Sequence, residues 1–159
     1  MAETLGSLYD KLSISKIRCE TIVNKKAEYI LANEFEKWSE LASKIAMQRD
    51  DLHKEIIDFI ESAKHGEIKI LEEPKYKIYQ GENSSGVGFD DLEDAVFHLA
   101  KMNKTLWDLE DSRRDKTKSD KEVRAICDDV AKFNRLRNDT MDEINRLFNE
   151  QVKVRKNQQ

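Results

Sequence analysis

The sequence predicts an all-α protein, a four-helix bundle made of two duplicated antiparallel helical hairpins. Apolar residues recur at intervals of three and four through four long segments. The chain has only five glycines and one proline, so little interrupts those segments. Its two halves also match at a constant offset of 88 residues. At 159 residues, we expect one domain, 1–159, with a modest core.

The first hairpin is expected over residues 3–65. Its first helix, near 3–31, carries an inward stripe of Leu5, Leu8, Leu12, Ser15, Cys19 and Ile22. The second helix, near 34–64, should begin where Asn33 and Glu36 have capping-box spacing and end at Gly66. Its inward residues include Trp38, Leu41, Ile45, Leu52, Ile56 and Phe59.

Residues 66–88 form the expected crossover, because the apolar period changes there. Ile68 and Ile70 alternate with charged residues and Pro74 follows, which indicates an irregular or short β segment. Glycine and serine dominate 81–88 and predict a flexible connection.

The second hairpin is expected over 89–150, with helices near 90–116 and 120–150. Capping-box spacing places their starts at Asp90 and Ser119, with Glu93 and Glu122 three residues later. The polar tail, 151–159, is expected to fray.

The offset of 88 pairs Arg49 with Arg137 and Asp51 with Asp139, and places basic pairs near both hairpin turns. This pattern predicts an internal duplication. A hairpin of two helices cannot bury its apolar face alone, so the two hairpins are expected to pack as one bundle.

Two arginines stand where an apolar residue is expected. Arg137 lies between Phe133 and Met141 on one helical stripe, and Arg49 interrupts the stripe of the first hairpin. In an antiparallel hairpin, Asn103 lies level with Arg137, and likewise Ser15 with Arg49. Each hairpin should therefore contain a polar layer.

These layers have two interpretations. In the first, Arg49 and Arg137 pair with Glu110, Glu20 or Asp108 and fix the helix register. In the second, the layer binds a small anionic ligand such as a nucleotide or sugar phosphate, with the arginines as bidentate donors. The candidate ligand-binding residues are Arg49, Asn103, Trp107, Glu110, Asn134, Arg137 and Asn138.

No arrangement of a nucleophile and a base is recognisable, so no catalytic residue is assigned. Asp108 with Asp111, and Asp139 with Asp142, have the spacing that MazG-like nucleotide pyrophosphohydrolases use for magnesium. Chance produces such pairs among 32 acidic residues, so we assign no metal site and no cofactor. A MazG-like activity remains the enzymatic alternative.

Composition limits the partners. The net charge of −4 gives no basic field, which disfavours nucleic acid. We expect no signal peptide and no membrane span, and hence a cytoplasmic protein. Cys19 and Cys127 lie on apolar stripes and are expected to be buried, reduced thiols. The favoured function is non-enzymatic binding or assembly, as a homo-oligomer or on a protein partner that the Tyr76–Tyr79 segment helps to contact.

Three motifs resemble an uncharacterised family of bacterial and phage helical proteins, sometimes encoded beside glycosyltransferases. They are the segment from Gly6 to Ile14, the segment from Leu106 to Asp111 with the following arginine pair, and the segment from Asn134 to Ile144. The resemblance implies a helical fold and no established activity. In shorter relatives the first two motifs share one helix, whereas here they fall in different hairpins, which fits duplication.

Overall fold

The computed structural model describes residues 3–68, 70 and 88–156. Five α-helices make up this part of the chain: α1 (Leu5–Asn24), α2 (Lys26–Leu31), α3 (Phe35–His65), α4 (Leu92–Arg113) and α5 (Asp120–Lys156). The described residues contain no strand, and the all-α class is confirmed. Most of the expected crossover, with Tyr76–Tyr79 and its possible β structure, lies outside the described residues.

The expected first helix is two helices in the structure, since α1 ends at Asn24 and α2 begins at Lys26, with Lys25 as the cap residue between them. The start of α1 carries a capping box that the sequence analysis missed: the Thr4 hydroxyl accepts from the Ser7 amide, and the Ser7 hydroxyl accepts from the Thr4 amide. Ser119 and Glu122 form the predicted box at α5.

Two predicted caps are wrong. Asn33 has a left-handed backbone, with φ of 58°, so it completes the turn after α2 and leaves Glu34 to precede α3. The cap of α4 is Asp91 rather than Asp90, and its carboxylate accepts from the Asp94 amide at 2.8 Å. The predicted stop at Gly66 is confirmed by its φ of 73°.

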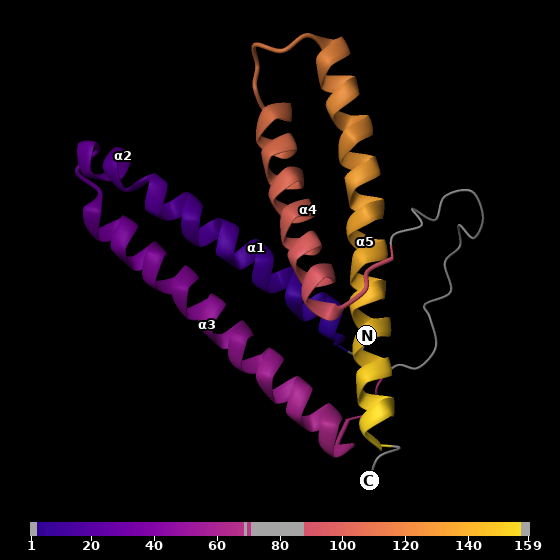
Figure 1. The fold of residues 1–159 in the computed structure, drawn as a ribbon. Helices are drawn as coiled ribbons and strands as arrows, with labels where there is room; N and C mark the ends of the chain where they lie inside the picture. Colours follow the sequence, from indigo (N-terminus) through magenta and orange to yellow (C-terminus); the bar gives the residue numbers. More distant parts are fainter. Residues whose placement is uncertain (1–2, 69, 71–87, 157–159) are drawn as a thin grey trace.

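The helices form two hairpins that diverge from a shared base (Figure 1). Hairpin 1 consists of α1, α2 and α3, and hairpin 2 consists of α4 and α5. The first half of α1 crosses α4 and α5 at the base, whereas the hairpin turns stand apart (Figure 1). The four long helices are therefore not packed side by side along their whole length.

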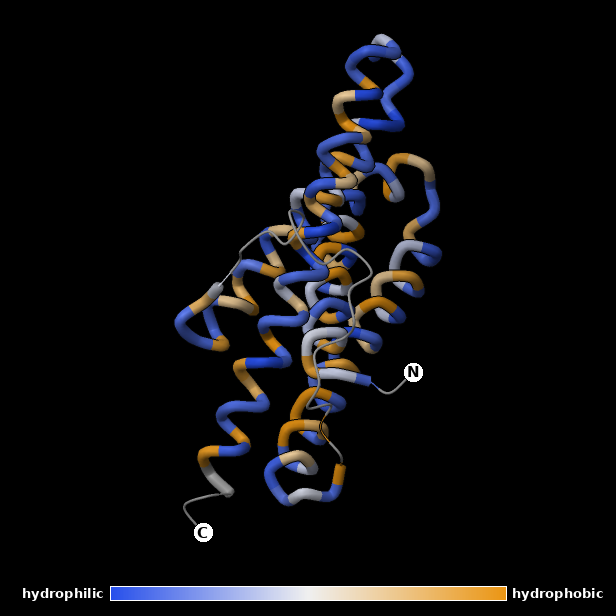
Figure 2. The backbone as a smooth tube through the Cα atoms, turned by 90° about the vertical axis from the view of Figure 1, so that its right-hand side faces the viewer, coloured by the Kyte–Doolittle hydropathy of each residue, from blue (hydrophilic) through white to orange (hydrophobic). Residues whose placement is uncertain are grey.

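The core lies at the base, where all four long helices contribute side chains. It consists of Leu5, Leu8, Leu12, Ile56, Ala63, Ala95, Leu99, Ile144, Leu147, Phe148 and Val152. Beyond the base, hydrophilic and hydrophobic residues alternate along each helix (Figure 2). Because Val152 is buried in this core, α5 continues to Lys156, and the expected fraying from residue 151 is wrong for 151–156.

Two further properties concern the surface. Cys19 is half-buried and Cys127 is exposed, so the expectation that both thiols are buried is wrong for Cys127. Among the helices of the described residues, none is long and apolar enough to cross a membrane.

Candidate functional site

A buried polar cluster joins the two hairpins at their base. It consists of Asp10 and Ser13 from α1, Asn103 from α4 and Arg137 from α5, and we call it the polar junction. Asp10, Ser13 and Asn103 are each at most 7% exposed. Polar groups buried to this degree must bind one another or lose free energy.

Arg137 and Asp10 form the charged pair of the polar junction. The arginine donates from Nε to Asp10 Oδ1 at 2.7 Å and from Nη2 to Asp10 Oδ2, so the contact is bidentate. This hydrogen bonding raises the pKa of the Arg137 guanidinium above its ordinary value, against the opposing effect of burial. The charge of Arg137 is thus neutralised within the protein.

Asn103 completes the polar junction from α4. Its amide nitrogen donates to Asp10 Oδ1 at 2.8 Å and to the Ser13 hydroxyl at 2.5 Å. Ser13 in turn donates to the Asp10 carbonyl oxygen at 2.9 Å. One carboxylate therefore receives hydrogen bonds from two helices of hairpin 2, which fixes the position of α1 on them.

Just below the polar junction, α1 approaches the backbone of α5 closely at Gly6. A Cβ at this position would lie 2.3 Å from the Met141 carbonyl oxygen. The Gly6 amide also donates to Asn145 Oδ1 at 2.8 Å, a contact between helices. Glycine is required here because no side chain fits between the two helices.

The structure brings together only two of the seven candidate residues, Asn103 and Arg137. The partners expected for Arg137 are wrong: it binds Asp10 of the other hairpin, while Glu110 pairs with Arg113 and Asp108 with Lys104 along α4. Periodicity places Arg137 on an inward stripe, but it does not reveal which helix of the other hairpin meets that stripe.

Arg49 takes no part in the polar junction. Its side chain is 37% exposed and pairs with the adjacent Asp50 at 2.7 Å. This pairing raises the pKa of Arg49. Trp107 and Asn134 are half-buried and Asn138 is exposed. The predicted layer of hairpin 1, Ser15 with Arg49, is absent among the described contacts.

Asp10, Ser13, Gly6 and Asn145 were missed by the sequence analysis. The signal for three of them is a second stripe on α1, formed by Gly6, Asp10, Ser13 and Ile17 at spacings of four, three and four. All four residues are buried, in addition to the expected leucine stripe. Two buried faces on one helix indicate that α1 packs against α3 and also against hairpin 2.

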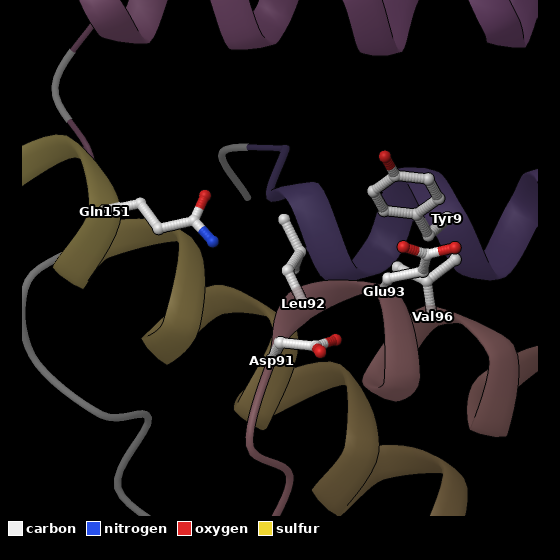
Figure 3. A pocket seen from close by; sticks show the side chains of 6 residues that line it. All are labelled: Tyr9, Asp91, Leu92, Glu93, Val96 and Gln151. Carbon is white, nitrogen blue, oxygen red and sulfur yellow. The ribbon is translucent and has the colours of Figure 1, made fainter.

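Outside the polar junction, the described residues line open grooves, two of which bear on ligand binding. The larger, of about 490 Å³, is lined by Tyr9, Asp91, Leu92, Glu93, Val96 and Gln151 (Figure 3). Burial raises the pKa of the Tyr9 hydroxyl above its usual 10.0. Acidic side chains on the rim disfavour an anionic ligand in this groove.

The second groove, of about 390 Å³, runs between α1 and α3 beside Ser15. The Ser15 hydroxyl is buried and has no hydrogen-bond partner among the described residues. Lys11 and Arg18 face Asp51 and Glu55 across the groove, so its lining carries both signs of charge. Neither groove contains Arg137 or Asn103.

Ser15→Ala should stabilise the protein, because it removes a buried hydroxyl that loses its hydrogen bonds to water on folding and gains none from the described residues. Such a group typically costs about 1–3 kcal/mol, and we expect a gain of about 1 kcal/mol in the free energy of unfolding. Urea denaturation measures this gain. Ser13→Ala is the control and should destabilise, since Ser13 holds Asn103. A loss of stability in Ser15→Ala would mean that its hydroxyl is bonded after all.

The described residues contain no group of three or more histidine, cysteine or acidic side chains that would hold a metal ion. Comparison of the chain with protein-family models, with curated proteins and with solved structures finds no match. The functional interpretation therefore rests on the geometry described above.

Proposed function

We propose that this protein is a non-enzymatic binding or assembly protein that acts as a homo-oligomer or on a protein partner. Its two hairpins serve as binding arms, held at a set angle by the polar junction. The observation that carries the proposal is the exposure of large hydrophobic side chains, which are Val23, Ile30, Leu31, Phe35, Leu41, Met47, Ile57, Phe97 and Val154. Exposed apolar surface of this kind favours contact with another protein.

The polar junction supports the same proposal. A site for an anionic ligand needs a cation that the ligand can neutralise, and Arg137 already has its carboxylate in Asp10. A ligand would have to displace a bidentate contact whose carboxylate side chain is 9% exposed and whose arginine side chain is 27% exposed. The polar junction acts instead as the connection between the arms.

We also propose that the hairpins arose by duplication. The start of α4 follows that of α1 by 92 − 5 = 87 residues, and the start of α5 follows that of α3 by 120 − 35 = 85. Both intervals are close to the sequence offset of 88. The resemblance to the uncharacterised bacterial and phage family remains a proposal; Asp10 and Arg137, which lie in two of its motifs, pair with each other at the base.

Thermal-shift measurements test the absence of a small anionic ligand. We expect nucleotides, sugar nucleotides and phosphate, each with and without magnesium, to leave the Tm unchanged. A ligand at a hundred times its Kd would add about 2.7 kcal/mol, a shift of several degrees. Stabilisation of the wild type that disappears in Asn103→Leu would favour the ligand-binding alternative.

Light scattering tests the assembly part of the proposal. We expect a mass above the 18.6 kDa of one chain, increasing with concentration. A strict monomer from micromolar to millimolar concentration would remove self-assembly and leave only a different protein as the partner.

A further inference from the structure

The turn of hairpin 1 exposes a concentrated apolar surface. Four of the large hydrophobic residues that are exposed in the described part of the chain lie there: Val23 is 60% exposed, Ile30 52%, Leu31 88% and Phe35 48%. They lie at the end of α1, at the end of α2 and at the start of α3, and we call this group of four residues the apolar tip. In Figure 1 the apolar tip stands away from α4 and α5, so hairpin 2 does not cover it.

Contacts within hairpin 1 fix the arrangement of the apolar tip. The Phe35 and Trp38 rings stack with centroids 5.5 Å apart, and Lys26 Nζ lies 5.0 Å from the Trp38 ring centroid. The Trp38 indole nitrogen donates to the Ile22 carbonyl oxygen at 2.7 Å, which ties α3 to the end of α1. The Glu34 amide closes the turn by donating to the Tyr29 carbonyl oxygen at 2.8 Å. These contacts hold the apolar residues in one arrangement before any partner binds.

The other hairpin shows that a turn between such helices does not need apolar residues. Residues 88 positions after Val23, Ile30 and Leu31 are Asp111, Lys118 and Ser119. The turn of hairpin 2, at the top of both views, is correspondingly hydrophilic (Figure 2). Forming the turn therefore does not explain the hydrophobic side chains of hairpin 1. Their exposure to water costs free energy that burial against a partner would recover.

The charges around the apolar tip are balanced in sign. The rim contains three lysines and three glutamates, a balance of 3 − 3 = 0, all exposed: Lys25, Lys26, Lys37, Glu28, Glu34 and Glu36. A nucleic acid or an anionic membrane gains nothing from a neutral rim. Lys37 pairs with Glu34 within one copy at 3.2 Å, but this pair is exposed and therefore weak. A second copy, turned by a twofold axis, can place its lysines against these glutamates and its glutamates against these lysines.

We propose that the apolar tip is the self-association surface of this protein, where two copies meet through a twofold interface. The apolar side chains form the centre of the interface and the lysines and glutamates its rim, the usual anatomy of protein contacts. This inference rests on the proposed assembly function and specifies its partner as a second copy of the chain.

A triple variant, Val23→Asp, Ile30→Lys and Leu31→Ser, tests the apolar centre. It gives hairpin 1 the residues that hairpin 2 carries 88 positions later, all compatible with a helical turn. We expect sedimentation velocity to show the wild type as a dimer and the variant as a monomer, with the dimer Kd raised about a hundredfold. Circular dichroism should be unchanged. The control is Phe97→Ser on α4, which removes a large hydrophobic side chain that is 72% exposed on the other hairpin and should leave the dimer intact.

Charge reversal tests whether the partner is a second copy. Lys25→Glu with Lys26→Glu makes one variant, and Glu34→Lys with Glu36→Lys makes the other. Each should associate more weakly with itself than the wild type does, because like charges then meet across the axis. An equimolar mixture should form the heterodimer, since opposite charges meet again.

The outcomes separate this inference from the proposed function. If the triple variant remains a dimer while the wild type is a dimer, another surface mediates assembly and the inference is overturned, although the function stands. The same holds if the two charge variants fail to associate on mixing. If the wild type is a monomer at every concentration, both self-assembly and the apolar tip as its surface are rejected.

Discussion

Arg137→Met should lower the free energy of unfolding by about 3–5 kcal/mol, the typical cost of removing one partner of a buried ion pair. The substitution strands Asp10, whose side chain is 9% exposed. Asn103 still donates to that carboxylate but cannot neutralise its charge. For a chain of this length the loss corresponds to about 6–20 °C in Tm, measurable by calorimetry.

Arg49→Met is the matched control, since Arg49 lies 88 residues before Arg137 and pairs with Asp50 at the surface. An exposed pair contributes little to stability because water screens it, so this variant should melt near the wild type. Adding Asp10→Leu to Arg137→Met should restore most of the stability, because both charges then leave the interior. If Arg137→Met melts with the wild type, the bidentate contact does not stabilise the base.

Gly6→Ala should destabilise the protein although alanine favours a helix by about 1 kcal/mol over glycine. The new methyl group would lie 2.3 Å from the Met141 carbonyl oxygen, a backbone atom that no rotamer change can move. α1 must therefore shift away from α5 and stretch the contact from the Gly6 amide to Asn145. We expect a net loss of about 2–3 kcal/mol by urea denaturation.

Gly88→Ala serves as the control, because a Cβ at Gly88 meets nothing within 4 Å. Its effect should stay within about 0.5 kcal/mol, as for other surface substitutions. Equal stability of Gly6→Ala and Gly88→Ala would show that the helices are further apart at Gly6 than described.

The long helices were predictable from local patterns. Apolar residues at helical spacing located them, and the left-handed Gly66 ended α3 where the sequence indicated. Asn33 was misassigned because asparagine suits both a helix cap and a left-handed turn, and neighbouring residues decide between them. The end of α5 was misjudged because only the packed core shows that Val152 is buried.

The polar junction was predictable in part. The sequence identified Arg137 and Asn103 as polar residues on inward faces and placed them level, and both contact the same oxygen of Asp10. The sequence could not assign Asp10 as their partner, because the register of helices within one hairpin does not determine the angle between the two hairpins. That angle depends on contacts such as Gly6 against Met141, which no periodicity encodes.

The divergence of the hairpins places one of the chain's two tryptophans in each arm, Trp38 on α3 and Trp107 on α4. Each indole therefore has a separate surrounding, and a Trp→Phe change at either position leaves a fluorescence signal from the other arm alone. Local opening of an arm exposes its own indole to water while the shared base remains folded. The chain thus carries two internal optical probes that distinguish loosening of one arm from unfolding of the whole protein.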